Sequence, residues 1–479
     1  MDAGLPDPRS GGLPEHSTGE DEGTMTKIAI IGAGLSGRLL ALNLARRGTS
    51  AVSIRMIDRG DIRYMGPAYS NEADYLLLNV RAGQMGAFSE DPEHFLTWAQ
   101  ERGARADRSD FLPRRLFRDY IVDLTREAWQ ARTNGPLFEH VCGEVTDIDT
   151  EGGCATIHVK AQEPFVVDRG ILALGNFPPR HPLIENRMAL QSGRYVRDPW
   201  AQGALAPLSR GDNVILIGSG QTTVDLVVAL YRLGHEGRIV AVSRHGLLPL
   251  AHRGFESYVS FFPEIKDSKR ILDIFRTVRK HLDRAKAMGI DERAVIDSLR
   301  PDTQTLWLGI PTDEKRRFLR HLFRYWEIIR SRIPPESEAI IATMRDAGQF
   351  NVIAGRIRDF VETEAALEVH YIPRGRTTDE VERAVLVINC IGPESNYSKV
   401  DHTLVRNLME RGLIRPGPAN LGIDALLNGA IIGRDGASSD VLYTLGSTMR
   451  GVLWEVIAVP DIRVQAERLA HLLIGGNLG

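Results

Sequence analysis

The sequence has few cysteines and no long apolar run. Its three cysteines, Cys142, Cys154 and Cys390, form neither a C-x-x-C pair nor a cluster with metal-ligand spacing, so neither a disulfide framework nor a metal site is expected. No apolar stretch reaches the roughly 18 residues that a transmembrane helix needs, so a membrane span is not expected. These features are typical of a reducing compartment, and we expect a cytoplasmic location.

The sequence also lacks an excess of either charge. Lys and Arg number 59 and Asp and Glu 62, which gives a formal net charge of -3 and no field that would attract nucleic acid. At 479 residues and 43% hydrophobic, the chain is long enough for two or three domains. Residues 1–24 are rich in Pro, Gly, Ser and acidic residues and lack the pattern of a signal or transit peptide. We expect them to form a disordered leader, with Met25 as an alternative start.

A glycine-rich turn follows the first strand pattern. Gly32-Ala33-Gly34-Leu35-Ser36-Gly37 stands between an apolar run at 27–31 and a helical pattern, and a second strand pattern at 52–57 completes a βαβ unit. The first glycine allows a tight turn, the second lets a diphosphate approach the backbone, and the third lets the helix pack closely. The helix N-terminus would bind the phosphates, and Asp58 would accept hydrogen bonds from a ribose. The alternative is a glycine turn that binds nothing. The predicted dinucleotide contacts are Gly32, Gly34, Leu35, Ser36, Gly37 and Asp58.

A second βαβ pattern begins well inside the chain. Gly218-Ser219-Gly220-Gln221-Thr222-Thr223 follows the strand pattern 214–217, with Thr223 in place of the third glycine, and the next strand pattern is 238–242. This unit has Arg244 where the first has an acid. A guanidinium can bind a 2′-phosphate that an acid would repel, so we predict NADPH rather than NADH. The alternative is a solvated cation at a strand end. The predicted contacts are Gly218, Ser219, Gly220, Gln221, Thr222, Ser243 and Arg244.

From 264 to 347 the sequence becomes helical and strongly charged. Seven cations alternate there with apolar residues at roughly helical spacing: Lys315, Arg316, Arg317, Arg320, Arg324, Arg330 and Arg332. We expect most of them to form a solvated face, with one or two pointing inward to bind a carboxylate substrate. His94, His252 and His321 have no partner at a catalytic spacing, and no role is assigned to them.

Two nested units of this kind resemble the flavoproteins with two dinucleotide-binding domains, in which FAD binds first and NAD(P)H second. The resemblance implies an α/β fold of two nested Rossmann-like domains with a helical insertion. Disulfide reductases of this plan carry a redox-active cysteine pair, which this sequence lacks. The implied division is a leader at 1–24, an FAD-binding domain at 25–200 and 396–479, an NADPH-binding domain at 201–263 and 348–395, and the insertion, a lid or substrate region, at 264–347.

The run from Leu76 to Pro92 resembles a pattern of class B flavin monooxygenases, in which an asparagine, here Asn79, lies beside the flavin. The whole chain resembles the broad FAD/NAD(P)-binding family that includes bacterial proteins of the YdhS type, through the segments 66–70, 76–92, 197–200, 243–249, 325–327 and 451–455. We also predict cofactor contacts at Arg59, Gln84, Met85, Val145, Gly175, Gly446 and Thr448. Two segments depart from related enzymes: 389–393 lacks an Ala-Thr-Gly-Tyr run of N-hydroxylases, and 445–448 lacks the acid that often holds the ribityl chain.

By this resemblance the protein is an FAD-dependent, NADPH-using monooxygenase that transfers one oxygen atom from O2 to a small-molecule substrate. Family analogy favours N-hydroxylation of a small amine or amino acid, and the cations of the insertion would suit an acidic one such as aspartate. Asn79 is the candidate catalytic residue, as a hydrogen-bond donor; the alternative is an asparagine that closes a turn. Two other functions stay open, an NADPH-dependent flavin reductase without oxygen insertion and a non-catalytic flavin-binding regulatory protein. Self-association also stays open.

Overall fold

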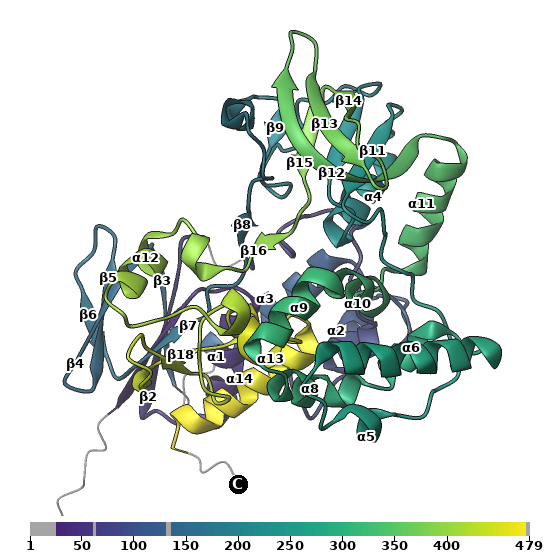
Figure 1. Cartoon of the computed structure of the whole chain (residues 1–479). Helices are drawn as coiled ribbons and strands as arrows, with labels where there is room; N and C mark the ends of the chain where they lie inside the picture. The colour runs from purple at the N-terminus through teal and green to yellow at the C-terminus, as the bar shows by residue number, and fades with distance from the viewer. Residues whose placement is uncertain (1–24, 61–63, 131–135, 476–479) are drawn as a thin grey trace, which may run out of the picture.

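The computed structural model describes residues 25–60, 64–130 and 136–475, so the leader expected at 1–24 lies outside the described residues. The described chain forms two units, each built on a mainly parallel sheet with antiparallel strands at one edge, and a separate group of helices (Figure 1). This architecture confirms the predicted α/β fold. Within the same residues, no helix combines the length and the apolar character needed to cross a membrane.

The first unit is built on a six-stranded sheet in the order β17-β18-β7-β1-β2-β3. Its strand β1 (Thr26–Ile31) pairs in parallel with β2 (Val52–Asp58) and β7 (Arg169–Leu172). The apolar residues of β1 are buried, as expected for a parallel strand covered on both faces. The helix α1 (Leu35–Arg47) connects β1 to β2 and packs against the C-terminal helix α14 (Val459–Leu473). The predicted first βαβ unit is thus confirmed.

Other elements complete the first unit. They are α2 (His94–Glu101), α3 (Arg114–Gln130), β3 (Leu137–Cys142), α12 (Thr403–Glu410), β17 (Ala430–Ile432), β18 (Ser438–Thr444) and α13 (Arg450–Leu453), with an antiparallel sheet of β4 (Val145–Glu151), β5 (Cys154–Val159) and β6 (Phe165–Val167). A small pair of strands, β8 (Phe177–Pro179) and β16 (Pro393–Glu394), lies where the chain leaves this unit and returns to it.

The second unit has a seven-stranded sheet in the order β14-β13-β12-β11-β10-β15-β9. The strand β10 (Val214–Ile217) pairs in parallel with β11 (Ile239–Ser243) and β15 (Leu386–Asn389), and α4 (Gln221–Arg232) follows β10 directly. The remaining strands are β9 (Tyr195–Val196), β12 (Phe350–Glu362), β13 (Leu367–Pro373) and β14 (Glu380–Ala384). The second predicted βαβ unit is therefore confirmed. Its sheet begins at β9, which lies inside the range 25–200 that the sequence assigned to the first unit.

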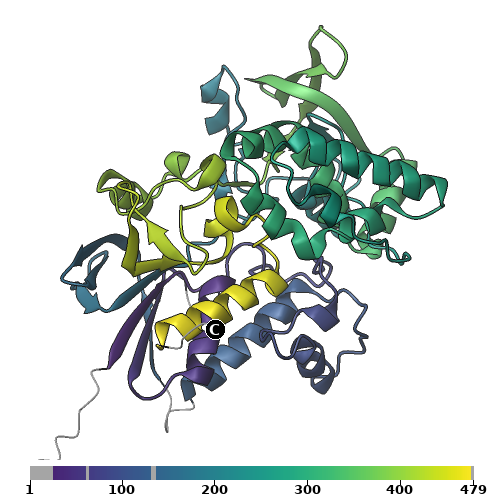
Figure 2. The ribbon, with the colours of Figure 1, turned by 60° about the horizontal axis from the view of Figure 1, so that its bottom comes forward.

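The helical stretch expected at 264–347 divides into two parts. The helices α5 (Phe262–Ile265), α6 (Ile271–Ala287), α7 (Glu292–Asp297), α8 (Thr303–Gly309), α9 (Thr312–His321) and α10 (Phe323–Arg330) include a hydrophobic core of their own. Figure 2 shows this group beside the second unit and above the helices of the first. The last helix, α11 (Pro335–Asp346), instead buries Ile340, Ile341 and Met344 against the second sheet. It is the crossover that two parallel strands, β11 and β12, require.

Two bidentate arginine–carboxylate pairs connect the two units and the helical group. Arg114, at the start of α3, contacts both carboxylate oxygens of Asp225 on α4 at 2.9 Å. Arg330 on α10 donates to both oxygens of Glu455, just after α13, at 2.9 and 2.8 Å. All four side chains are largely buried. Buried charges need their partners, so each pair fixes the relative placement of two parts.

Candidate functional site

The first glycine turn is shaped by close backbone contacts. Gly32 has a φ of +108°, and a Cβ on it would lie 2.3 Å from the carbonyl oxygen of Ala173, which follows β7. A Cβ on Gly37 would lie 2.1 Å from the carbonyl oxygen of Gly32. The space beside Gly34 is open, since a Cβ there would meet only the Met65 carbonyl oxygen, at 3.9 Å. The first and third glycines are therefore required by the fold, whereas the second leaves room for a ligand.

The residues of this turn fit a bound diphosphate. No side chain caps α1 at Gly34, and the first N–H that bonds within the helix is that of Arg38. The N–H groups of Leu35, Ser36 and Gly37 make no hydrogen bond with any residue that the structure describes, so they are available to phosphate oxygens at the positive end of the helix dipole.

Asp58 has a role that the sequence did not predict. Its carboxylate accepts hydrogen bonds from the backbone N–H of Ala33 at 2.7 Å and of Gly60 at 3.0 Å. It therefore braces the turn from the end of β2, and its predicted contact with a ribose stays a prediction. Next to it, Arg59 lies 2.8 Å from the His402 ring and 3.7 Å from Glu144.

Arg38 also supports this turn, and the sequence did not predict this contact. Its side chain is fully buried, and Nε donates to the carbonyl oxygen of Ala33 at 2.8 Å. Because an arginine in the second turn of a helix usually lies in solvent, the sequence carried no signal for this contact.

The second turn repeats the same construction. Gly218 has a φ of +123°, and a Cβ on it would lie 2.5 Å from the carbonyl oxygen of Cys390, which follows β15. Thr223 stands where the first unit has its third glycine, and its hydroxyl donates to the carbonyl oxygen of Gly218 at 3.0 Å. Ser219 is buried, and its hydroxyl lies 2.8 Å from that of Ser243 and donates to the Leu247 carbonyl oxygen at 2.7 Å. Serine side chains thus connect the turn to the end of β11.

Gln221, at the start of α4, points away from the turn. Its amide donates to the carbonyl oxygens of Ser331 and Arg332 at 2.8 and 2.9 Å. Its side chain therefore holds the end of α10, so the predicted cofactor contact of Gln221 is that of its backbone N–H. Thr222, the next residue of α4, is half-buried.

Arg244 lies exposed just after β11 and lines a cavity of about 560 Å³. Arg356 from β12, and Arg374 and Arg376 from just after β13, line the same cavity. Arg376 is paired with Glu380. In the described part of the chain, the other three guanidinium groups have no carboxylate within ion-pair distance, so the cavity is suited to an anion.

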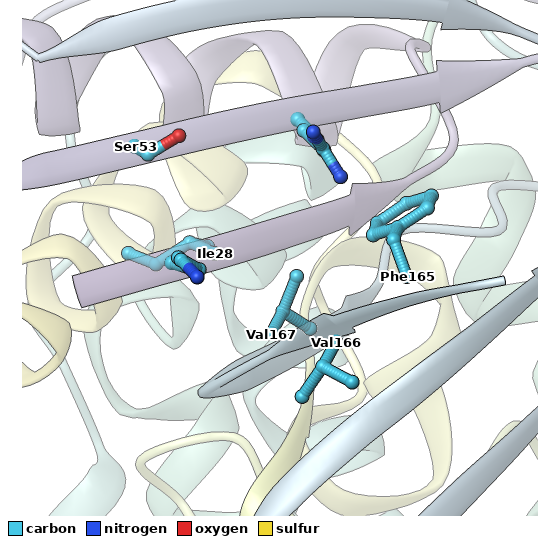
Figure 3. A pocket seen from close by; sticks show the side chains of 7 residues that line it. Ile28, Ser53, Phe165, Val166 and Val167 are labelled. Atoms are coloured by element: carbon cyan, nitrogen blue, oxygen red, sulfur yellow. The ribbon is translucent and has the colours of Figure 1, made fainter. Parts of the chain in front are cut away.

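Another cavity, of about 260 Å³, lies between Lys27, Ile28, Ser53, Arg55 and the strand β6 (Figure 3). Lys27 and Ser53 stand at the amino ends of β1 and β2, whereas the glycine turn follows the carboxyl end of β1. Dinucleotides bind at the carboxyl ends of parallel strands, so this cavity is separate from the predicted site.

Asn79 is exposed, and its side chain makes no hydrogen bond with any residue that the structure describes. Its carbonyl oxygen lies 3.0 Å from Nε2 of His252, whose ring packs on Phe111 with centroids 4.8 Å apart. Burial lowers the pKa of His252 to about 4, so the imidazole is neutral near pH 7 and donates this hydrogen bond. His252, to which the sequence assigned no role, therefore connects the second unit to the backbone of Asn79.

The other predicted cofactor residues lie in different surroundings. A Cβ on Gly446 would lie 2.3 Å from Oγ of Ser36, so the structure brings Gly446 to the first turn. Gly175 has a φ of +67° and follows β7, and Gln84 accepts a hydrogen bond from Arg463 on its carbonyl oxygen. Met85, Val145 and Thr448 are buried, and the Thr448 hydroxyl donates to the Leu445 carbonyl oxygen at 2.7 Å.

Most cations of the insertion have acidic partners. Arg317 pairs with Glu314, Arg324 with Glu327, Arg330 with Glu455 and Arg332 with Asp297. Arg316 and Arg320 are exposed. Lys315 is only 6% exposed, and no described carboxylate lies within ion-pair distance of its ammonium group, which is 5.1 Å from the centroid of the Trp307 ring. Arg324, Arg330 and Arg332 are also largely shielded from solvent, so four of the seven cations point inward rather than one or two. Lys315 is the one of these four that has no acidic partner among the described residues.

Comparisons with known proteins agree with this geometry. Residues 29–177 match a family model described as FAD-NAD(P)-binding, as predicted for the first unit. Ornithine N-hydroxylase from Kutzneria sp. 744, solved with reduced FAD, NADP+ and L-ornithine, is 13% identical, with 93% of this chain and 98% of that chain covered and a TM-score of 0.63. L-Lysine 6-monooxygenase from Pseudomonas syringae is 15% identical, with coverages of 94% and 99% and a TM-score of 0.61.

The fold is not confined to oxygenases. A bacillithiol disulfide reductase from Bacillus cereus is 12% identical, with coverages of 94% and 98% and a TM-score of 0.53. No curated protein matches the chain. The solved structures therefore show the fold, and the family model supports FAD and a nicotinamide dinucleotide as cofactors.

The two turns can be tested separately. We expect Gly32→Ala to lose FAD, and Gly218→Ala to keep FAD but lose NADP+ binding, because each new Cβ would collide with a backbone carbonyl at a positive φ. Flavin absorbance of the purified protein and calorimetric titration with NADP+ measure the two effects. Gly193→Ala is the control, since a Cβ there meets nothing within 4 Å. Loss of FAD from Gly218→Ala with NADP+ binding intact would reverse the assignment.

Proposed function

We propose that the protein is an FAD-dependent, NADPH-using monooxygenase that N-hydroxylates a small amine or amino acid. The observation that carries the proposal is the repeated glycine turn. In each unit the turn follows a parallel strand, and its first glycine lies against the backbone carbonyl of a residue that follows a neighbouring strand. The similarity of nearly the whole chain to solved N-hydroxylases supports the reaction class. We keep the resemblance to the YdhS type as part of the same proposal.

In this mechanism FAD, NADPH and O2 supply electron transfer and the reactive oxygen. The chain binds the two diphosphates at the helix N-termini of α1 and α4. Asn79 would donate an amide N–H towards the reacting oxygen, and His252 holds the backbone of Asn79 in place. These residues orient the reactants without themselves changing redox state.

The insertion packs against the C-terminal part of the first unit, and we propose that this contact limits the access of water to the reaction site. Trp454 has a φ of +64°, an unfavourable conformation for a residue other than glycine, and its ring stacks on that of Trp307 with centroids 4.5 Å apart. The indole N–H of Trp307 donates to the Gly451 carbonyl oxygen at 2.8 Å. The insertion therefore closes on the segment that follows Gly446 and Thr448. Excluding water favours oxygen transfer over the release of H2O2.

A reductase without oxygen insertion is the competing function. The described cysteines do not support a disulfide reductase, because Cys142 is exposed, Cys154 is half-buried and Cys390 is buried, and all three are free. The two functions differ in whether NADPH oxidation yields an oxygenated product. The amount of oxygenated product formed per NADPH oxidised therefore tests the proposal.

Replacing Asn79 should uncouple the reaction. In Asn79→Ala we expect NADPH to be oxidised at a similar rate while product per NADPH falls roughly 10-fold and H2O2 rises, because one positioned hydrogen bond is lost. Product, H2O2 and NADPH are measured in the same reaction with a small-amine panel as substrate. Asn351→Ala, at an exposed position of β12, is the control. Coupling as in the wild type would exclude the role of Asn79, and a wild-type protein that only makes H2O2 would exclude the monooxygenase.

We further propose that Arg244 binds the 2′-phosphate of NADPH at the cavity it shares with Arg356 and Arg374. We expect Arg244→Ala to lower the ratio of kcat/KM for NADPH to that for NADH by roughly 10- to 100-fold, since a charge-assisted contact is lost. Flavin reduction under anaerobic conditions with each nucleotide gives the ratio. Arg376→Ala lines the same cavity but removes a guanidinium already paired with Glu380, so it should change the ratio little. An unchanged ratio in Arg244→Ala would contradict this assignment.

Lys315 is our candidate for recognising an acidic substrate. Burial lowers its pKa, and an acidic partner would compensate the buried charge. We expect Lys315→Met to raise the KM for an acidic amino acid such as aspartate roughly 10- to 100-fold and to leave the KM for a simple diamine unchanged. Arg316→Ala, at the exposed neighbouring position, is the control. Equal effects on both substrates, or no effect, would remove Lys315 from substrate recognition.

A further inference from the structure

The two glycine turns differ in what lies in front of them. Beside Gly34 the nearest atom to an added Cβ is a backbone oxygen at 3.9 Å. Beside Gly220, the corresponding glycine, the nearest atoms are Nη1 and Nη2 of Arg324, at 3.6 and 3.8 Å. The second glycine of such a turn is the position at which a diphosphate approaches the backbone. A guanidinium group of the insertion therefore stands beside the predicted phosphate position of the second site.

The contacts of Arg324 hold it in this orientation. Nη1 pairs with Glu327 on the same helix, while Nη2 donates to Oγ of Ser219 at 3.2 Å and to the carbonyl oxygen of Leu247 at 3.3 Å. The side chain is 18% exposed, so it does not extend into solvent as a surface arginine would. Both contacts of Nη2 are long and made to neutral oxygens, which are weaker partners for a guanidinium than phosphate oxygens.

The helix that carries Arg324 is fixed to the second turn and to the first unit. The Gln221 amide, at the start of α4, binds the two carbonyl groups just after α10. Arg330, near the end of α10, is paired with Glu455. Arg324 therefore projects from a helix whose position relative to the turn is already set, as is needed for a phosphate ligand.

We propose that Arg324 binds the diphosphate of the nicotinamide dinucleotide, so that the helical insertion completes the second nucleotide site. The contact is electrostatic and involves no covalent step. Arg324 is one of the seven cations that the sequence offered as substrate ligands, but its side chain is directed to the phosphate turn. The inference rests on the proposed function, because it takes the second turn to be the NADPH site. It adds to the second site a phosphate-binding residue that comes from outside the βαβ unit.

The test compares ligands that share only part of the nucleotide, by calorimetric titration of the FAD-loaded protein. NADP+ and NAD+ both contain the diphosphate, whereas adenosine 2′-monophosphate contains the 2′-phosphate alone. We expect Arg324→Ala to weaken NADP+ and NAD+ equally, by roughly 10- to 100-fold, and to leave adenosine 2′-monophosphate unchanged. Arg324→Lys, which keeps the charge, should recover part of the loss. Arg244→Ala should show the opposite pattern, with NADP+ and adenosine 2′-monophosphate weakened and NAD+ unchanged.

Controls separate this effect from misfolding and from local charge changes. FAD content and thermal unfolding are measured for every variant, and Arg324→Gln serves if Arg324→Ala loses FAD. The double variant Arg324→Ala/Glu327→Gln removes the carboxylate left behind and should still bind NADP+ more weakly than the wild type. Arg320→Ala, an exposed cation of the neighbouring helix, should bind as the wild type does.

Three results would overturn the inference. NADP+ binding by Arg324→Ala equal to that of the wild type would do so and leave the proposed function standing, provided that NADPH still reduces the flavin. Selective weakening of NADP+ over NAD+ would move Arg324 to the 2′-phosphate. A wild-type protein that binds neither dinucleotide would overturn both the inference and the proposed function.

Discussion

A backbone carbonyl pressed against a glycine is the contact on which both nucleotide sites depend. In each sheet the chain after a neighbouring strand, at Ala173 or Cys390, places its carbonyl oxygen where the first glycine of the turn would carry a side chain. The glycine allows the strand end and the helix start to approach that closely. This approach directs the N-termini of α1 and α4 towards the carboxyl edge of each sheet. Electrostatic attraction for phosphates is then a consequence of backbone geometry.

The two sites differ in how the rest of the molecule supports them. The first turn is braced from within its own unit, by Asp58 on Ala33 and by the buried Arg38. The second turn is supported by Ser243 at the end of β11, which contacts Ser219 of the turn, and by Gln221, which connects it to the insertion. The contacts that support the first turn therefore come from its own unit, whereas those of the second turn include α10 and the residues just after it. Since α10 is also bound to the segment around Glu455, the second site and the covering of the first unit are physically connected.

The sequence was sufficient to predict features that depend on neighbouring residues, but not contacts between segments far apart in the chain. Glycine spacing and apolar runs located β1, α1, β10 and α4, because these patterns depend on neighbours along the chain. The contacts of His252 with Asn79 and of Arg324 with Ser219 join segments far apart in sequence, and helical spacing identifies a face but not its partner. For the same reason α11 was grouped with the insertion, although it packs on the second sheet.

The distribution of acids among the cations of the insertion decides which of them can serve a ligand. An arginine paired with a largely buried carboxylate, such as Arg330 with Glu455, would leave that carboxylate unpaired if it turned to a substrate, at a cost of several kcal/mol. Lys315 forms no such pair, because no described carboxylate lies within ion-pair distance of its ammonium group. For Arg324 the cost of leaving its carboxylate partner is intermediate, since Glu327 is a neighbour on the same helix and is one-third exposed. Charge pairing therefore separates structural cations from those available to phosphate or carboxylate, a division that composition alone does not contain.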